Sequence, residues 1–177
     1  MPSLRDVGVA VAVLTLTLGT SIAAAQAPKE GKDQSSSQLT LKACGAADKE
    51  INYSAETDKT THPTPEPPPA MAMVYVLRPT MMGNGMQTKL AVDGEWKGVN
   101  RGNNYFFFPL GPGEHYVCSK AENRSVITIN VEAGKTYYLQ QHITMGVLKA
   151  RNSVDIMKED EAKQKLEKLN PSTWKSK

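Results

Sequence analysis

The stretch that carries most of the information about the fold is KLAVDGEWKGVNRGNNYFFFPLGPGEHYVCSKAENRSVITINVEAGKTYYLQQH, residues 89–142. It alternates short apolar segments with glycine-containing turns. These turns are Asp93-Gly94, Gly111-Pro112-Gly113 and Ala133-Gly134. An Asp-Gly pair favours a tight hairpin turn, because both central residues of such a turn adopt positive φ. Alternation within a strand buries one face, so Ile127, Ile129 and Val131 are expected in the core. The stretch therefore predicts a series of hairpins.

The same pattern continues on both sides of this stretch, over residues 71–157. Met73–Leu77 has the composition of a buried strand, and Val147–Met157 can supply a last one. About seven or eight short strands with closely spaced turn signals favour two packed sheets. We predict an all-β fold, a single antiparallel β-sandwich of immunoglobulin-like type.

The N-terminal residues 1–25 have the order of a secretory signal peptide. Arg5 gives a weakly basic start, Val7–Ile22 is apolar, and small residues follow. Cleavage is predicted after Ala25, with Ala27 as the alternative site. The apolar run of about 16 residues is shorter than the roughly 20 of a spanning helix, so no transmembrane segment is expected after cleavage. An exported protein, periplasmic or secreted, is predicted; an uncleaved membrane anchor is the alternative.

Two segments lie between the signal peptide and the sandwich. Residues 26–40 are polar and are predicted to be a disordered leader. Residues 41–70 are an N-terminal extension, in which Glu50–Thr57 alternates like an added edge strand. The proline-rich run His62–Pro69 is interpreted as a stiff connector rather than a docking site for a proline-recognising domain.

The periodicity changes in residues 158–177, which are predicted to form a C-terminal helix and tail. Ala162, Leu166 and Leu169 share one face of such a helix. Pro171 should end the helix, leaving a loose tail.

Cys44 and Cys118 are the two cysteines of the chain. Exported chains with two cysteines usually pair them, so we predict a disulfide that fixes the N-terminal extension to the sandwich. Closing so long a loop contributes roughly 4 kcal/mol in the chain-entropy description. Two free thiols, or a redox or metal role, are the alternatives.

Several sequence elements resemble a known family. They are Val92-Asp93-Gly94 with Gly98, Pro112-Gly113-Glu114-His115 and Ala133-Gly134-Lys135-Thr136-Tyr137-Tyr138. In this order they resemble a bacterial exported family of the "domain of unknown function 2846" type, related to the PEGA domain. The resemblance covers roughly residues 71–143. It implies a PEGA-like β-sandwich in the cell envelope, and it implies no catalytic residues.

The histidines do not stand in a catalytic pattern. His62, His115 and His142 have neither metal-ligand nor nucleophile–base spacing, and His115 is expected to bond locally after the Gly-Pro-Gly turn. We therefore predict no enzyme, no catalytic residues and no cofactor, with an uncharacterised enzyme as the third interpretation.

A methionine-rich segment suggests an alternative function. Thioethers are soft ligands suited to Cu(I). Met81, Met82 and Met86, with His62 nearby in the sequence, could form a copper site in an exported protein. The competing interpretation is that these methionines fill gaps or lie in a loop.

The aromatic row Tyr105–Phe108 and Trp96 form the second candidate site. In a strand, Phe106 and Phe108 point one way and Tyr105 and Phe107 the other. The outward pair is either covered by residues 41–61 or exposed. Exposure would make Trp96, Tyr105 and Phe107 a binding surface for a peptide, a glycan or another envelope protein.

The net charge of +3 is too small to suggest nucleic acid as a partner. The sequence therefore predicts a non-catalytic envelope protein, a binding or accessory module whose partner is an unknown envelope protein, peptide or glycan.

Overall fold

The computed structural model describes residues 30–46, 52–80, 82–145 and 150–176. The predicted signal peptide and its two cleavage sites lie outside the described residues. The elements, in chain order, are α1 (Glu30–Cys44), β1 (Tyr53–Thr57), β2 (Ala72–Arg78), β3 (Thr88–Val92), β4 (Glu95–Asn100), β5 (Asn104–Leu110), β6 (Gly113–Lys120), β7 (Arg124–Val131), β8 (Thr136–Met145), β9 (Ala150–Met157), α2 (Glu159–Leu166) and β10 (Asn170–Ser176).

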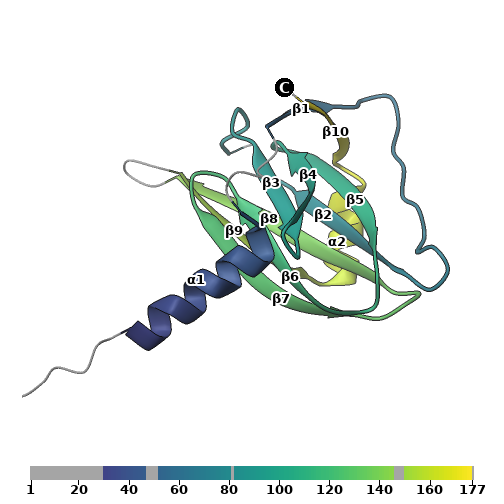
Figure 1. The fold of residues 1–177 in the computed structure, drawn as a ribbon. Helices are drawn as coiled ribbons and strands as arrows, with labels where there is room; N and C mark the ends of the chain where they lie inside the picture. The colour runs from purple at the N-terminus through teal and green to yellow at the C-terminus, as the bar shows by residue number, and fades with distance from the viewer. Residues whose placement is uncertain (1–29, 47–51, 81, 146–149, 177) are drawn as a thin grey trace, which may run out of the picture.

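Two sheets pack face to face, which confirms the predicted sandwich (Figure 1). One has six strands in the order β1-β10-β5-β2-β8-β9, and the other has four in the order β4-β3-β6-β7. The sandwich is not wholly antiparallel, because β2 pairs with β8, and β5 with β10, in parallel. Parallel neighbours need long crossover connections. The chain between β2 and β8 contains β5 and all four strands of the other sheet.

The main core lies between the sheets. Alternation along β2 points Val74 and Val76 inward, where Phe106, Phe108 and Leu139 join them. From the opposite sheet come Leu90, Val92, Val117, Ile129 and Val131. The predicted inward face of β7 is therefore confirmed, as is the prediction that Phe106 and Phe108 share one face of their strand; that face points inward.

A second apolar cluster covers the outer face of the six-stranded sheet. Met73, Tyr75 and Leu77 of β2 lie here with Tyr105 of β5 and Tyr138 of β8. Helix α2 packs against them through Ala162 and Leu166, and Leu169, predicted to share this stripe, joins the cluster just after the helix ends. These outer-face residues are buried, as are the residues that face the main core. The central strands of the six-stranded sheet therefore carry apolar side chains on both faces.

The chain outside the sandwich differs from the sequence prediction at two places. Residues 30–40, expected to be part of a disordered leader, belong to α1. The C-terminal end of this helix is buried through Ala43 and Cys44, and this tertiary contact supports a helix that its polar composition alone would not stabilise. Figure 1 shows α1 leading away from the sheets toward its N-terminal end.

The predicted loose tail is also wrong, because residues 170–176 form β10. This strand lies between β1 and β5, so it joins the predicted edge strand β1 to the sheet. Trp174 packs edge-on against Phe106, with the ring centroids 5.4 Å apart. These contacts come from distant parts of the chain and compensate for the weak local β-propensity of the segment.

The predicted disulfide between Cys44 and Cys118 is present, with Cα atoms 5.1 Å apart. It attaches the end of α1 to β6 across a sequence separation of 74 residues. Ala91, Trp96, Tyr116 and Val126 surround it.

Candidate functional site: a cleft on the outer sheet face

Two tyrosines of an aromatic row, Tyr75 and Tyr138, form the floor of the candidate site. Tyr75 of β2 lies opposite Phe107 of β5 and beside Tyr138 of β8. Its ring centroid is 5.5 Å from each of those two rings. Since residues in register on one face of a sheet are neighbours, one aromatic residue per strand is enough to build this row.

The proline-rich strap, residues 62–69, forms one wall. Two tyrosine hydroxyls fix it to the sheet: Tyr75 Oη donates to the Pro65 carbonyl at 2.6 Å, and Tyr105 Oη donates to the Pro63 carbonyl at 2.9 Å. The ring of His62 packs against Tyr105. Burial raises the pKa of Tyr105 to about 12, so its hydroxyl remains a donor at neutral pH.

Helix α2 and the turn before β8 form the other walls. Between them and the strap is a cleft of about 620 Å³. Its lining residues are His62, Thr64, Pro65, Glu66, Pro67, Tyr75, Gly134, Thr136, Tyr138, Glu159, Lys163, Leu166 and Glu167.

Charged side chains surround this floor. Lys163 Nζ lies 2.7 Å from Glu159 Oε1, one turn away on α2, and this hydrogen bond raises the pKa of Lys163. Burial is the main cause that raises the pKa of Tyr138, and Lys163 and Glu159 act on it with opposite signs. The remaining carboxylates, Glu66 and Glu167, line the cleft from the strap and from the end of α2.

The predicted aromatic binding residues do not form one surface. Tyr105 is fully buried and Phe107 half-buried in the outer cluster, whereas Trp96 lies half-buried beside the disulfide of the other sheet. The carbonyl group that accepts a hydrogen bond from Tyr105 Oη belongs to Pro63 of the strap, outside the predicted covering segment 41–61.

The predicted copper ligands lie in two different segments. Met82 and Met86 belong to the loop between β2 and β3, where the side chain of Met82 is 52% exposed. His62 lies in the strap, against Tyr105, and Met81 is outside the described residues. The carbonyls of Met82, Gly83 and Met86 accept hydrogen bonds from the buried guanidinium of Arg78. Copper binding stays a prediction.

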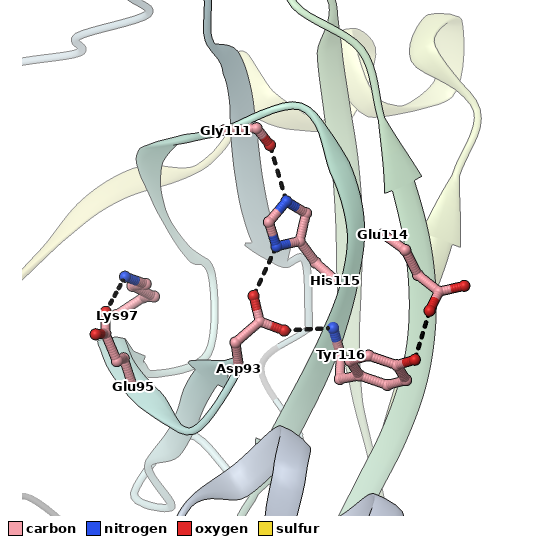
Figure 2. A network of polar contacts seen from close by, with 7 residues as sticks. All are labelled: Asp93, Glu95, Lys97, Gly111, Glu114, His115 and Tyr116. Atoms are coloured by element: carbon pink, nitrogen blue, oxygen red, sulfur yellow. Dashed lines mark hydrogen bonds and ion pairs between the residues drawn. The ribbon is translucent and has the colours of Figure 1, made fainter.

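His115 takes part in a polar network at the turn between β3 and β4 (Figure 2). Its Nδ1 lies 2.6 Å from Asp93 Oδ2 and its Nε2 lies 2.8 Å from the Gly111 carbonyl. Asp93 Oδ1 also accepts from the backbone N–H of Tyr116 at 2.9 Å. Burial raises the pKa of Asp93, but the hydrogen bonds from His115 and Tyr116 outweigh it and hold the pKa below 3.8. The predicted local bonding of His115 is therefore confirmed.

The cleft residues Glu66, Tyr75, Tyr138 and Glu167 were missed as candidate site residues by sequence reasoning. Tyr75 shares a strand face with Met73, and Tyr138 shares one with Thr136, so each strand presents a tyrosine on one face. The sequence does not show that these two faces are neighbours, because that depends on the order of the strands in the sheet. The two glutamates give no sequence signal, because isolated carboxylates are usual on an exposed segment.

Comparisons with known proteins agree with the resemblance found in the sequence. Residues 69–154 match the family described as "Protein of unknown function (DUF2846)". An "Uncharacterized protein" of Haemophilus influenzae is 26% identical over 133 residues, covering 75% of this chain and 77% of that protein. No solved structure matches the chain. The relation to the PEGA domain stays a prediction.

Among the residues that the structure describes, no helix is long and apolar enough to span a membrane. The same residues contain no group of three or more His, Cys, Asp or Glu side chains placed to hold a metal ion.

Proposed function

We propose that this chain is an exported, non-catalytic binding module of the bacterial envelope, and that its ligand occupies the cleft between the strap and α2. The observation that carries this proposal is the aromatic floor enclosed by walls from three parts of the chain. A concave site with an apolar floor and a few convergent polar groups is the usual form of a ligand site, and about 620 Å³ lies within the usual range.

The walls of the cleft are held in place without a ligand. Hydrogen bonds from Tyr75 and Tyr105 fix the strap, and the buried stripe of α2 fixes the helix. A site that is already formed loses little conformational entropy when it binds, which favours affinity. This arrangement supports binding rather than mere covering of the sheet.

The use of two of the three histidines, His115 and His142, supports a non-catalytic role. Both ring nitrogens of His115 are engaged, by Asp93 and by the Gly111 carbonyl. His142 Nε2 lies 2.9 Å from Asp155 Oδ2, and its Nδ1 lies 3.2 Å from the Gln140 amide. A general base needs a ring nitrogen that is free to accept the substrate proton, whereas the nitrogens of these two rings contact other groups of the protein.

The disulfide supports an exported location. Disulfides persist in the periplasm and outside the cell, and they are rare in the reducing cytosol. The bridge between Cys44 and Cys118 therefore agrees with the signal peptide predicted from the first 25 residues. The partner would be an envelope protein, a peptide or a glycan.

The proposal is tested by filling the cleft. Thr136 lines it at the start of β8, and T136W would place an indole in it. T128W is the matched control, because Thr128 is an exposed strand threonine on β7 of the other sheet. Ligand-observed NMR of the wild-type protein would screen neutral and charged oligosaccharides, short peptides and aliphatic amines.

We expect at least one of these ligand classes to bind to the wild type and to T128W but not to T136W. Two results would overturn the proposal: no class binds, or the binding that is found survives in a correctly folded T136W.

A further inference from the structure

We infer that the cleft selects an organic cation, an ammonium or guanidinium group on an aliphatic chain, such as a basic side chain of a peptide or a free aliphatic amine. This inference rests on the proposed function and adds the chemical class of the ligand.

The charge of the lining is the first reason. Three carboxylates line the cleft, those of Glu66, Glu159 and Glu167, against one lysine, Lys163. Lys163 is already paired with Glu159. Within the described part of the chain, neither Glu66 nor Glu167 has an ion-pair partner. The cleft is thus locally acidic although the whole chain carries +3, and a cation is the complementary ligand.

An unused polar group on the floor is the second and independent reason. Tyr138 is only 6% exposed, yet its hydroxyl makes no hydrogen bond to any residue that the structure describes. Its neighbour Tyr75 uses its own hydroxyl on the strap. This hydroxyl oxygen reaches the solvent of the cleft, where it can accept a hydrogen bond from an N–H donor of a bound ligand.

The aromatic floor is the third reason. The ring of tyrosine attracts a cation to its face because of its quadrupole, and the attraction grows where water is displaced. The same chain already uses this contact elsewhere: Lys42 Nζ lies 3.8 Å from the centroid of the Tyr116 ring. Tyr75 and Tyr138 would supply the equivalent surface in the cleft, with Glu66 and Glu167 on its sides.

The test compares a charged ligand with a neutral ligand of the same shape. Calorimetric titration at low ionic strength would use acetyl-Gly-Lys-Gly-amide, the same peptide with norleucine in place of lysine, and cadaverine. We expect the lysine peptide or cadaverine to bind, and the norleucine peptide to bind at least about fivefold more weakly. Preference for the peptide or for cadaverine tells whether the cation belongs to a polypeptide or is a free amine.

Three variants locate the binding. The double variant E66Q/E167Q removes both unpaired carboxylates, and we expect about four- to twenty-five-fold weaker binding, since each exposed ion pair contributes about two- to fivefold. Y138F removes only the unused hydroxyl, and we expect it to weaken binding by about two- to fivefold, the contribution of one such contact. E161Q is the control, because Glu161 lies on the same helix, pairs with Lys165 and does not line the cleft.

Equal binding of the lysine and norleucine peptides, or unchanged affinity of E66Q/E167Q, would overturn the inference. The proposed function fails separately. If a neutral glycan binds and T136W abolishes that binding, the cleft is a ligand site but not a cation site. If nothing binds in the cleft, both proposals are wrong.

Discussion

At the scale of single residues, Asp93 shows how one side chain connects local geometry to stability. It has positive φ in the β3–β4 turn and accepts hydrogen bonds from His115 and from the Tyr116 backbone. Asparagine tolerates the same backbone conformation. D93N therefore removes the charge with little strain, and we expect it to lower the free energy of unfolding at pH 7 by about 1 kcal/mol, a small value because the carboxylate is partly exposed.

The effect of D93N should depend on pH. The folded-state pKa of Asp93 is depressed below 3.8, so its stabilisation is present above the unfolded-state pKa and is lost as pH falls through the folded-state pKa. Urea unfolding of both proteins should show a difference that is constant at neutral pH and shrinks below about pH 4. A difference that persists unchanged at lower pH would contradict the role given to this carboxylate.

Two glycines give a matched steric prediction. A Cβ on Gly98 would lie 2.7 Å from a Phe106 ring carbon and 2.8 Å from a Trp174 ring carbon, whereas a Cβ on Gly111 meets nothing within 4 Å. We expect G98A to destabilise the protein by about 1–3 kcal/mol through overpacking. G111A should be neutral or slightly stabilising. Chemical denaturation measures both, and equal stabilities would show that β4 and β10 do not pack as described.

The residue scale is also where sequence reasoning succeeded best. Alternation correctly divided Tyr105–Phe108 into an inward and an outward pair, because the side-chain period of a strand is a local property. What covers the outward pair was not predictable in this way. The Pro63 carbonyl lies 42 positions from Tyr105, and its contact depends on the course of the whole strap.

At the scale of elements, α1 depends on a covalent link. The helix is polar over most of its length, and its buried residues are at the end that carries Cys44. We expect C44S/C118S to lower the free energy of unfolding by about 2–4 kcal/mol. Hydrogen exchange should show loss of amide protection in α1 before the sheets. Protection of α1 equal to that of the oxidised protein would contradict its dependence on the bridge.

The element that sequence reasoning missed, β10, shows why short terminal strands are hard to predict. Its sequence NPSTWKS has little alternation and contains a proline. Its strand conformation depends on β1 and β5, which precede it by more than sixty residues in the chain. By contrast, α2 was predictable, because its apolar stripe and its ion pairs at i and i+4 are local.

At the scale of the whole molecule, a buried polar network joins the two sheets. Gln141 of β8 accepts from Thr88 and Asn100 of the four-stranded sheet and donates to Ser119 of β6. Ser119 in turn donates to Asn152 of β9 at 2.6 Å. Asn100 Oδ1 has no partner among the described residues, but the other bonds of this network form in one relative placement of the sheets, so they favour a single packing over slipped alternatives.

The cleft is likewise a property of the whole molecule. The strap and α2 are separated in sequence by about a hundred residues, and they meet at the cleft because β2 lies beside β8. The parallel pairing of these strands, unexpected from the sequence, is what places Tyr75 next to Tyr138. Local patterns can therefore predict the sandwich but not the site.

The most direct measurement is a two-dimensional NMR titration of the oxidised mature protein with the lysine peptide or cadaverine. Binding in the cleft should perturb amide resonances of Thr64, Glu66, Thr136, Tyr138 and Lys163, and leave those of Trp96 and the Met82–Met86 loop unchanged. Perturbations that are absent from the cleft residues, or that centre on Trp96 or on the methionine loop, would contradict the assignment of the outer-face cleft as the binding site.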